Sequence, residues 1–447
     1  MARERACKAA RRAFHAACAA DTWPDSPSLA PPLLAWERWR LAAVYAEDLA
    51  SNGDDARSRC VFDAVLPSWR DAPSEADIRD AVRRVSVSRK AQSSSESAPE
   101  AHVALGLDLV RAGASPAHAT AIVAAAVAGA RKGHRDVLAF EKRLLSSSAK
   151  PEDANRTEKP VVTAVAHRHV VHIDVDGVHL VGLSHAAMDK LSAMHARHGR
   201  QGERDDPKAT TCRIAALAVR YRAMLGAGFQ AAVGGAVFDL LRDRVGVTME
   251  CFASPLNARW SRFCSAHEDV DAPFGSAGSF NAFRPLRGSY QANPPFVPRI
   301  MDDMAERIVA LLKTAAAADE PLAFVVFIPG WQETRCWQTM MDEASPATPF
   351  RRLAFVIAAD EHGFVDGASH APRRDTYRAS PYDTGVFFLL TDAAQRKFHV
   401  TAQLETAVRA TMLDCRPTAA AAGRQERKRK TGGMRKKKKK DQKEEDE

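Results

Sequence analysis

The stretch GSYQANPPFVPRIMDDMAERIVALLKTA, residues 288–315, indicates the fold class of this 447-residue chain most clearly. It begins as a short strand pattern and passes through two adjacent prolines, which can neither continue a helix nor donate within a sheet. Apolar residues then recur at helical spacing, among them Ile300, Met304 and Ile308, and Pro298 suits the first turn of that helix. The stretch therefore predicts a strand, a stiff loop and an amphipathic helix in succession.

Strand and helix patterns alternate on both sides of this stretch. VGVTMECFASPLN (245–257) predicts a strand that ends in a loop of small residues, and PLAFVVFIPGW (321–331) predicts a fully buried strand. WQTMMDEA predicts a short helix, and RRLAFVIAADEH and DTGVFFLLTD predict two further strands. This alternation indicates an α/β fold with a mostly parallel sheet. Ligands of such sheets bind beyond the carboxyl ends of the strands, where the 253–257 and 293–296 loops would lie.

The rest of the chain divides into segments of different composition. Residues 1–100 predict a helical and partly disordered region that ends in the polar linker KAQSSSESAPE. Residues 101–240 predict a mainly helical domain with a β-hairpin near 161–182, whose turn is Asp176-Gly177. The helices expected in it are 101–112, 116–131, 134–147, one capped by Ser184 and ended by Gly199, and about 208–225.

The positive charge of the chain is concentrated in its last part. The formal net charge is +9, and residues 424–440 alone contain eleven Lys or Arg and one Glu. We expect residues 411–447 to form a disordered, solvated tail. Two basic clusters separated by a short gap match a nuclear-import signal, which predicts a nuclear location and import receptors as partners. A solubilising tail is the alternative.

Composition also excludes several classes of protein. The longest apolar runs, at 122–129 and 322–328, are far too short to span a bilayer, so no membrane partner is expected. The N-terminal segment lacks a leucine-rich apolar core and carries Glu4, which argues against a secretory signal; a mitochondrial presequence remains an alternative. The eight cysteines are scattered without a C-x-x-C pair, which indicates a reducing intracellular compartment.

Four histidines raise the question of a metal site. His167, His169, His172 and His179 alternate along the predicted hairpin, but no matching cluster of cysteines or carboxylates accompanies them in the sequence. Structural zinc sites usually have paired, tightly spaced ligands. The sequence therefore predicts no metal site.

The proline loop Asn293-Pro294-Pro295-Phe296 is the candidate catalytic segment. An exocyclic amine of a nucleobase is a poor nucleophile, because its lone pair is delocalised into the ring. The side-chain carbonyl of Asn293 and the backbone carbonyl of Pro294 could accept its two N–H bonds and direct the lone pair towards a methyl donor. Phe296 offers a flat face on which a base could stack. A plain proline turn with a buried Phe is the alternative interpretation of these four residues.

Asn/Asp-Pro-Pro-aromatic after a strand resembles the signature of S-adenosylmethionine-dependent methyltransferases that act on planar nitrogens. These include adenine-N6, some guanine-N2 and glutamine methyltransferases. The ordered set MECFASPLN, DVDAPFGSAGSF, GSYQANPPF, VVFIPGW, DEHGFVDGASH and TGVFFLLTD further resembles the phosphorylated CTD-interacting factor family over about 236–395, and more weakly over 178–240. Members of that family are cap-specific adenosine N6-methyltransferases. They act on the (2′-O-methyl)adenosine next to the 7-methylguanosine cap of messenger RNA.

This resemblance implies a fold, a cofactor and a substrate. The fold is α/β: a Rossmann-like methyltransferase domain at 241–410, preceded by the mainly helical domain. The cofactor is S-adenosyl-L-methionine, and the partner is capped RNA that begins with adenosine. The positions implied for catalysis and base binding are Asn293, Pro294, Pro295 and Phe296. Those implied for cofactor binding are Ala253, Ser254, Pro255, Leu256, Asn257, Asp271, Phe274, Gly275 and Ser276.

Some positions match the family without a role or depart from it. Glu361, His362 and His370 match a family segment whose function is open between a substrate contact and a satisfied loop histidine. Gly330 stands in FIP-x-W where the family suggests an acid. The residue that grips the 7-methylguanine is also open, and the aromatic candidates are Tyr221, Trp260, Trp331 and Trp337.

A second departure concerns the WW module that animal members carry to bind the phosphorylated polymerase tail. Trp23, Trp36 and Trp39 lie in proline-bearing, helix-like sequence rather than in three short strands. We therefore expect no WW domain, which leaves binding to the C-terminal domain of RNA polymerase II in doubt.

Two other functions compete with the cap methyltransferase. The first is an adenine-N6 methyltransferase that acts on internal RNA or on DNA. The second is a catalytically silent scaffold that binds RNA or the polymerase tail, against which the intact Asn293–Phe296 loop argues.

Overall fold

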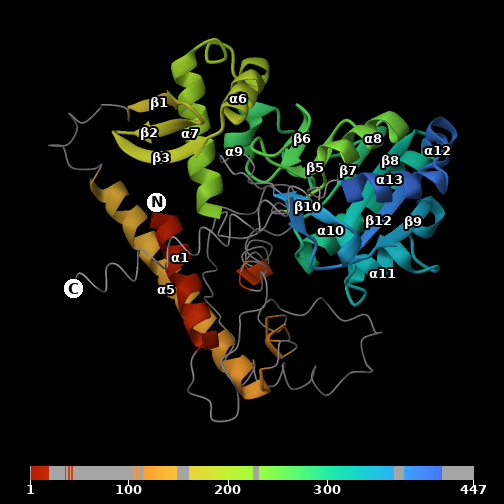
Figure 1. The fold of residues 1–447 in the computed structure, drawn as a ribbon, viewed down its shortest axis with the longest axis horizontal. Helices are drawn as coiled ribbons and strands as arrows, with labels where there is room; N and C mark the ends of the chain where they lie inside the picture. The colour runs from red at the N-terminus through yellow and green to blue at the C-terminus, as the bar shows by residue number, and fades with distance from the viewer. Residues whose placement is uncertain are drawn as a thin grey trace, which may run out of the picture.

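The computed structural model describes residues 2–19, 36, 39–40, 42–43, 105–106, 108–110, 114–147, 161–224, 231–366 and 377–414. These residues form a long helical pair, a small sheet with two helices, and a larger α/β unit (Figure 1). The predicted linker at 90–100, the basic tail at 424–440, Trp23 and His370 lie outside the described residues.

The helical pair consists of α1 (Ala2–Ala19) and α5 (Pro116–Ser147), which lie side by side (Figure 1). Phe14 of α1 packs against Trp36, whose ring centroid is 5.7 Å away. The prediction of separate helices at 116–131 and 134–147 is wrong, because α5 runs through Gly133 without a break. One glycine weakens a helix by about 1 kcal/mol, which burial of the α5 face against α1 outweighs.

A three-stranded antiparallel sheet follows, in the order β1 (Val162–His167), β2 (Val170–Val175) and β3 (Val178–Leu183). The predicted hairpin is confirmed as β2–β3. Asp176 and Gly177 in its turn both have positive φ, at 50° and 72°, as a two-residue type I′ turn requires. β1 adds a third strand.

Two helices pack on one face of this sheet, α6 (His185–His198) and α7 (Pro207–Met224). The predicted ends of α6 are confirmed: the Ser184 side chain accepts the Ala187 N–H, and Gly199 is the C-cap residue. Because residues 161–183 form a sheet, a single mainly helical domain over 101–240 is not confirmed.

The α/β unit is built on a six-stranded sheet in the order β6-β5-β7-β8-β12-β9. The four strands from β6 to β8 are parallel to one another, whereas β12 is antiparallel to both of its neighbours. The predicted mostly parallel sheet is thus confirmed, and the arrangement is compatible with a methyltransferase fold. Its strands are β5 (Glu250–Ala253), β6 (Phe263–Ser265), β7 (Gly288–Ala292), β8 (Leu322–Pro329), β9 (Arg351–Ile357) and β12 (Thr384–Leu390).

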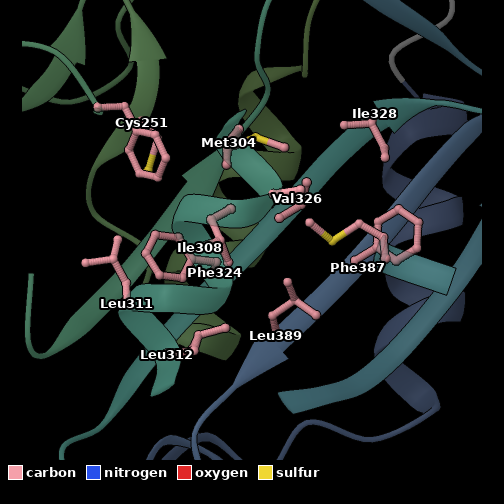
Figure 2. Close-up of a cluster of buried hydrophobic side chains, with 14 of the residues drawn as sticks. Cys251, Met304, Ile308, Leu311, Leu312, Phe324, Val326, Ile328, Phe387 and Leu389 are labelled. Atoms are coloured by element: carbon pink, nitrogen blue, oxygen red, sulfur yellow. The ribbon is translucent and has the colours of Figure 1, made fainter. Parts of the chain in front are cut away.

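Helices cover both faces of this sheet. The first face packs on α10 (Pro298–Ala317) and α11 (Arg335–Met341). The core between this face and the helices includes Ile308, Phe324 and Leu389 (Figure 2). The other face packs on α8 (Gly235–Val245), α12 (Asp392–Phe398) and α13 (Gln403–Asp414). Every residue of β8 is buried, as its continuous apolar sequence predicts for a strand covered on both faces.

The remaining elements are short. Beside the main sheet lies a small antiparallel sheet in the order β11-β10-β4. Its strands and the other short elements are β4 (Ala231–Ala232), β10 (Gly363–Asp366), β11 (Tyr377–Ala379), α9 (Glu268–Asp271) and the 3-10 turns Ala272–Phe274, Thr348–Phe350 and Ala359–Glu361.

Two observations concern the predicted compartment and membrane contacts. Cysteines 7, 18, 212, 251, 264 and 336 are free thiols. None of the helices in the described part of the chain is both long and apolar enough to cross a bilayer.

Candidate active site

The order of the strands locates a switch point between β5 and β7. The chain passes from β5 to β6 on one side and then returns to β7 on the other side of β5. The carboxyl ends of β5 and β7 therefore lie next to each other, and open sheets bind ligands at such a point. The loops that leave these two ends are Ala253–Asn257 and Asn293–Phe296. The structure thus brings together the two loops that the sequence singles out.

Asn293 is held by a hydrogen bond to β4 of the β11-β10-β4 sheet. Its Nδ2 donates to the carbonyl oxygen of Ala231 in β4 at 2.6 Å. Because a carbonyl can only accept, the amide nitrogen must face Ala231, and Oδ1 must face the other way. Oδ1 is buried, and it has no hydrogen-bond partner among the described residues. A buried acceptor without a partner costs about 1–3 kcal/mol, so this oxygen is suited to receive a donor from a ligand.

The rest of the proline loop is partly accessible. Pro294 is buried, Pro295 is exposed and Phe296 is half-buried. Val297 N–H donates to the carbonyl of Pro295 at 2.7 Å, and within the described chain no backbone N–H donates to the carbonyl of Pro294. The Phe296 ring lies 6.1 Å from Phe364 and 6.3 Å from Trp331, measured between centroids. Phe296 is therefore not the fully buried core residue of a plain proline turn.

The turn after β5 is closed by its own side chains. The backbone N–H and the hydroxyl of Ser254 both donate to Oδ1 of Asn257, at 2.7 and 3.0 Å. Ser254, Pro255 and Leu256 are buried, and Leu256 packs in the core under α6 and α7. Asn257 thus closes the turn, and the N–H groups of Asn257 and Ala258 both donate to the carbonyl of Ser254.

Glu250, which the sequence analysis missed, anchors the chain that follows this turn. Glu250 is 5% exposed, and its carboxylate accepts the N–H of Arg259 at 2.6 Å. Burial raises the pKa of Glu250 to about 7, and the backbone N–H groups of Arg259 and Trp260 and the charge of Lys190 on α6 oppose that rise. Burial lowers the pKa of Lys190 to about 8, against the attraction of Glu250. An acid inside an apolar strand was the signal that could have indicated this role.

Two of the implied cofactor residues point into the core instead. Asp271 has no exposed surface, and its Oδ2 accepts from the Tyr221 hydroxyl at 2.6 Å and from the His267 N–H at 3.1 Å. Burial raises the pKa of Asp271 to about 6, and these hydrogen bonds oppose the rise. Phe274 also has no exposed surface and packs against His195. Both side chains are therefore buried, and Oδ1 of Asp271 has no hydrogen-bond partner among the described residues.

Gly275 and Ser276 lie alongside β6, where Ser276 forms a parallel bridge with Phe263 at the start of the strand. Gly275 has φ of 101°, and a Cβ at that position would be 2.2 Å from the carbonyl oxygen of Ser261, so a glycine is needed. The hydroxyl of Ser276 lies 2.6 Å from that of Ser265. The carboxylates exposed after β6 belong to Glu268 and Asp269, and Asp269 pairs with Arg220.

The family segment around His362 has a structural explanation. His362 is wholly buried, with Nδ1 at 2.7 Å from the Ala358 carbonyl and Nε2 at 2.7 Å from the Thr384 hydroxyl. Nδ1 must carry the proton, and Nε2 accepts from Thr384. His362 is therefore a satisfied loop histidine, which was one of the two alternatives. Glu361 pairs with Arg409 at 3.5 Å.

Gly330 allows two chain segments to approach closely. Its N–H donates to the carbonyl of Asp383 at 2.7 Å, and a Cβ on Gly330 would lie 2.9 Å from the Cβ of Asp383. An acidic side chain at position 330 would therefore displace Asp383. The carboxylate of Asp383 accepts the N–H of Ala359 at 2.9 Å.

On the β1-β2-β3 sheet, the rings of His167, His172 and His179 contact one another edge to face. Nδ1 of His179 is 3.3 Å from Nδ1 of His172 and 3.1 Å from Oδ1 of Asp174. Across the described residues, no group of three or more His, Cys, Asp or Glu is arranged to hold a metal ion.

Comparisons with known proteins point to one family over part of the chain. Residues 190–367, from within α6 to the residue after β10, match the family model described as "Phosphorylated CTD interacting factor 1 WW domain". A human protein named mRNA (2'-O-methyladenosine-N(6)-)-methyltransferase is 36% identical over 198 residues, which cover 43% of this chain and 27% of the human protein. A mouse protein of the same name is 39% identical over 184 residues, 40% of this chain and 25% of the mouse protein. The match spans about a quarter of the length of these relatives.

The description of the matching family corrects one expectation. It names a WW domain, which conflicts with our expectation that the chain lacks one. That expectation is withdrawn, and with it the reason given against binding to the polymerase tail.

Proposed function

We propose that this protein is an S-adenosylmethionine-dependent, cap-specific adenosine N6-methyltransferase. Its substrate would be the (2′-O-methyl)adenosine next to the 7-methylguanosine cap of messenger RNA. The names of the human and mouse relatives support both the reaction and the substrate. Because the match covers only about a quarter of those proteins, further support must come from the residues of this chain.

The single observation that carries the proposal is the buried, unpartnered Oδ1 of Asn293 at the switch point. An adenine amino group has two N–H bonds, and Oδ1 of Asn293 and the carbonyl of Pro294 are acceptors on adjacent residues. Accepting both bonds turns the nitrogen lone pair out of conjugation and stabilises the positive charge that develops during transfer. Phe296 would stack on the adenine ring and hold it in that orientation. No strong general base is required, because the nitrogen becomes acidic once the methyl group is attached.

The residues around β5 and β6 fit S-adenosylmethionine, which supplies an electrophilic methyl group on sulfur. The backbone of the Ala253–Asn257 turn would hold its methionine part at the switch point. The exposed carboxylate of Glu268 after β6 would accept the ribose hydroxyls, in place of the buried Asp271. Glu250 accepts the N–H of Arg259 and so holds the chain that follows this turn in place.

The test is methylation of short RNAs that begin with adenosine, one set capped and one uncapped. After incubation with the full chain and S-adenosylmethionine, mass spectrometry of the digested RNA identifies the methylated nucleoside. We expect N6-methylation of the adenosine next to the cap and little on uncapped RNA. Equal methylation of both sets would favour an adenine-N6 methyltransferase of internal RNA or DNA. No detectable cofactor binding by calorimetry would favour the scaffold.

Binding to the phosphorylated C-terminal domain of RNA polymerase II is proposed as a partner interaction, on the description of the matching family. Fluorescence anisotropy with a labelled heptad-repeat peptide, phosphorylated and unphosphorylated, measures it. Preference for the phosphorylated peptide would support the interaction, and equal or absent binding would remove it.

A further inference from the structure

The β1-β2-β3 sheet has one edge strand, β1, that is exposed on both of its faces. β1 pairs with β2 on one side, and no strand of the described chain pairs with its other side (Figure 1). Every residue from Thr163 to His167 is exposed, and Val162 is half-buried. In the main sheet, by contrast, no residue of any of the six strands is exposed. β1 is therefore an unusually accessible strand.

The hydrogen bonds at the start of β1 show which of its backbone groups face outwards. The Val161 carbonyl accepts the N–H of Asp176 at 2.9 Å, and the Val161 N–H donates to Oδ1 of Asp176 at 2.9 Å. Both backbone groups of Val161 thus point towards β2. Because these groups alternate in direction along a strand, those of Val162, Ala164 and Ala166 point away from β2. They form a row of donors and acceptors with which an added strand could pair.

β1 lacks the features that usually prevent another strand from pairing with an edge, which are charged side chains, prolines and bulges. Its sequence, VTAVAH, contains no Lys, Arg, Asp, Glu or Pro, and its register with β2 is uninterrupted. Val161 and Val165 are apolar, and 62% and 46% of their surfaces are exposed. The edge of the sheet at β1 is therefore open to pairing.

The edge of the main sheet at β9 shows the opposite arrangement. β9 begins with Arg351 and Arg352, and Nη2 of Arg409 on α13 donates to the carbonyl of Val356 at 2.7 Å. A side chain thus occupies a backbone acceptor of this edge strand. One long edge carries charges and a side-chain contact while the other is left accessible, which indicates that the β1 edge serves as an interface.

β1 is complementary to itself in the antiparallel orientation. When Ala164 lies opposite Ala164 of a second copy, Val162 lies opposite Ala166, and Thr163 lies opposite Val165. The outward backbone groups of the two strands then form about six hydrogen bonds across a two-fold axis. The facing side chains are small or β-branched and uncharged, so no like charges meet.

The ends of the paired strands are also complementary in charge. In this arrangement the turn at Arg168 of one copy comes to the end of the sheet where Asp176 of the other copy lies. Both side chains are exposed, and Asp176 has a second carboxylate oxygen besides the Oδ1 that bonds Val161. A parallel pair would bring Arg168 next to Arg168 instead. Charge therefore favours the antiparallel pair.

We propose that β1 pairs with β1 of a second copy of this chain, in antiparallel orientation about a two-fold axis at Ala164. The two three-stranded sheets then become one continuous sheet through both copies. This inference concerns assembly and does not rest on the proposed methyltransferase activity. An extended peptide of another protein is the competing occupant of the same edge.

Sedimentation velocity of the full chain at several concentrations measures the assembly, and we expect a dimer whose fraction rises with concentration. Ala164→Lys and Ala164→Glu each place like charges opposite each other at the two-fold axis. Each variant should therefore raise the dissociation constant of the dimer by about tenfold or more. An equimolar mixture of the two variants should dimerise again, because Lys then faces Glu. Ala317→Lys, at an exposed position of α10, is the matched control and should dimerise like the wild type.

Three results would overturn the inference. The first is a wild-type chain that is monomeric at every concentration, which would leave an extended peptide as the occupant of this edge. The second is a dimer that both charge variants retain, which would place the interface elsewhere. The third is a pair of variants that stay monomeric when mixed although circular dichroism shows that both are folded.

Discussion

The side-chain amide of Asn293 donates to the backbone carbonyl of Ala231, 62 residues earlier in the chain, at 2.6 Å. This bond joins the loop after β7 to the small sheet of β4, β10 and β11. It orients the amide so that the unpartnered Oδ1 faces away from Ala231.

Substitutions at Asn293 distinguish the structural function of its Nδ2, which bonds Ala231, from the proposed catalytic function of its Oδ1. Asn293→Ala should fold with a melting temperature close to that of the wild type and lose at least about a hundredfold in kcat, the usual effect of removing one group that stabilises transition-state charge. Asn293→Asp keeps an acceptor but sets a carboxylate against the Ala231 carbonyl, so it should melt at a lower temperature than Asn293→Ala. Turnover on capped RNA and circular dichroism measure both. An alanine variant with more than a tenth of wild-type kcat would refute the assignment.

We expect Phe296 to position the base by stacking on it. Phe296→Ala removes the ring surface beside Trp331 and Phe364. We expect a rise in KM for RNA of about tenfold, since stacking of a base on an aromatic ring contributes about 1–3 kcal/mol. Phe296→Tyr keeps the ring and serves as the matched control, with KM near the wild-type value. The dissociation constant of S-adenosylmethionine should be unchanged in both variants, and an equal loss of cofactor affinity would show that the loop itself has collapsed.

Buried Glu250 and half-buried Lys190 attract each other, and each opposes the shift that burial imposes on the other's pKa. Glu250→Gln still accepts the Arg259 N–H but leaves the Lys190 charge without compensation. Each single variant, Glu250→Gln and Lys190→Met, should be less stable than the wild type, and the double variant should recover part of the loss. We expect a coupling free energy on the order of 1–3 kcal/mol from denaturant unfolding of the four proteins. Strictly additive effects would show that the two groups do not interact.

The pH dependence of stability should report on Asp271. Its pKa is raised to about 6 by burial, so the folded state favours the protonated carboxyl more than the unfolded state does. The resulting stabilisation is present below the ordinary pKa of Asp, near 4, and is lost as the pH rises through about 6. Between pH 4 and pH 7 the wild type should therefore lose stability relative to Asp271→Asn, by no more than about 3 kcal/mol. Melting curves of the two proteins that shift in parallel with pH would contradict this assignment.

We propose that residues 424–440 direct the protein to the nucleus. Deletion of 424–447 should reduce nuclear accumulation of a fluorescent fusion and leave methylation of short RNA unchanged, because the active-site residues lie at 253–296. A variant in which the Lys and Arg residues of 424–440 are replaced by Gln is the matched control for length and should behave like the deletion. Unchanged nuclear accumulation of both variants would leave the solubilising tail as the explanation.

Features that depend only on neighbouring residues could be predicted from the amino-acid sequence. The 3.6-residue periodicity of α10, the apolar run of β8, the Asp176-Gly177 turn and the Ser184 cap are all local, and all are found in the structure. The proximity of the 253–257 and 293–296 loops was also predictable, because the carboxyl ends of parallel strands lie at the same edge of a sheet.

Features that depend on residues far apart in the chain could be seen only once the chain was folded. Glycine at position 133 does not break α5, because packing against α1 outweighs its low helix propensity. Asp271 is buried in the core, where it accepts the hydroxyl of Tyr221, 50 residues earlier. The partner of Asn293 and the neighbours of Trp331 likewise come from distant segments, and a periodic pattern contains no information about which distant segments meet.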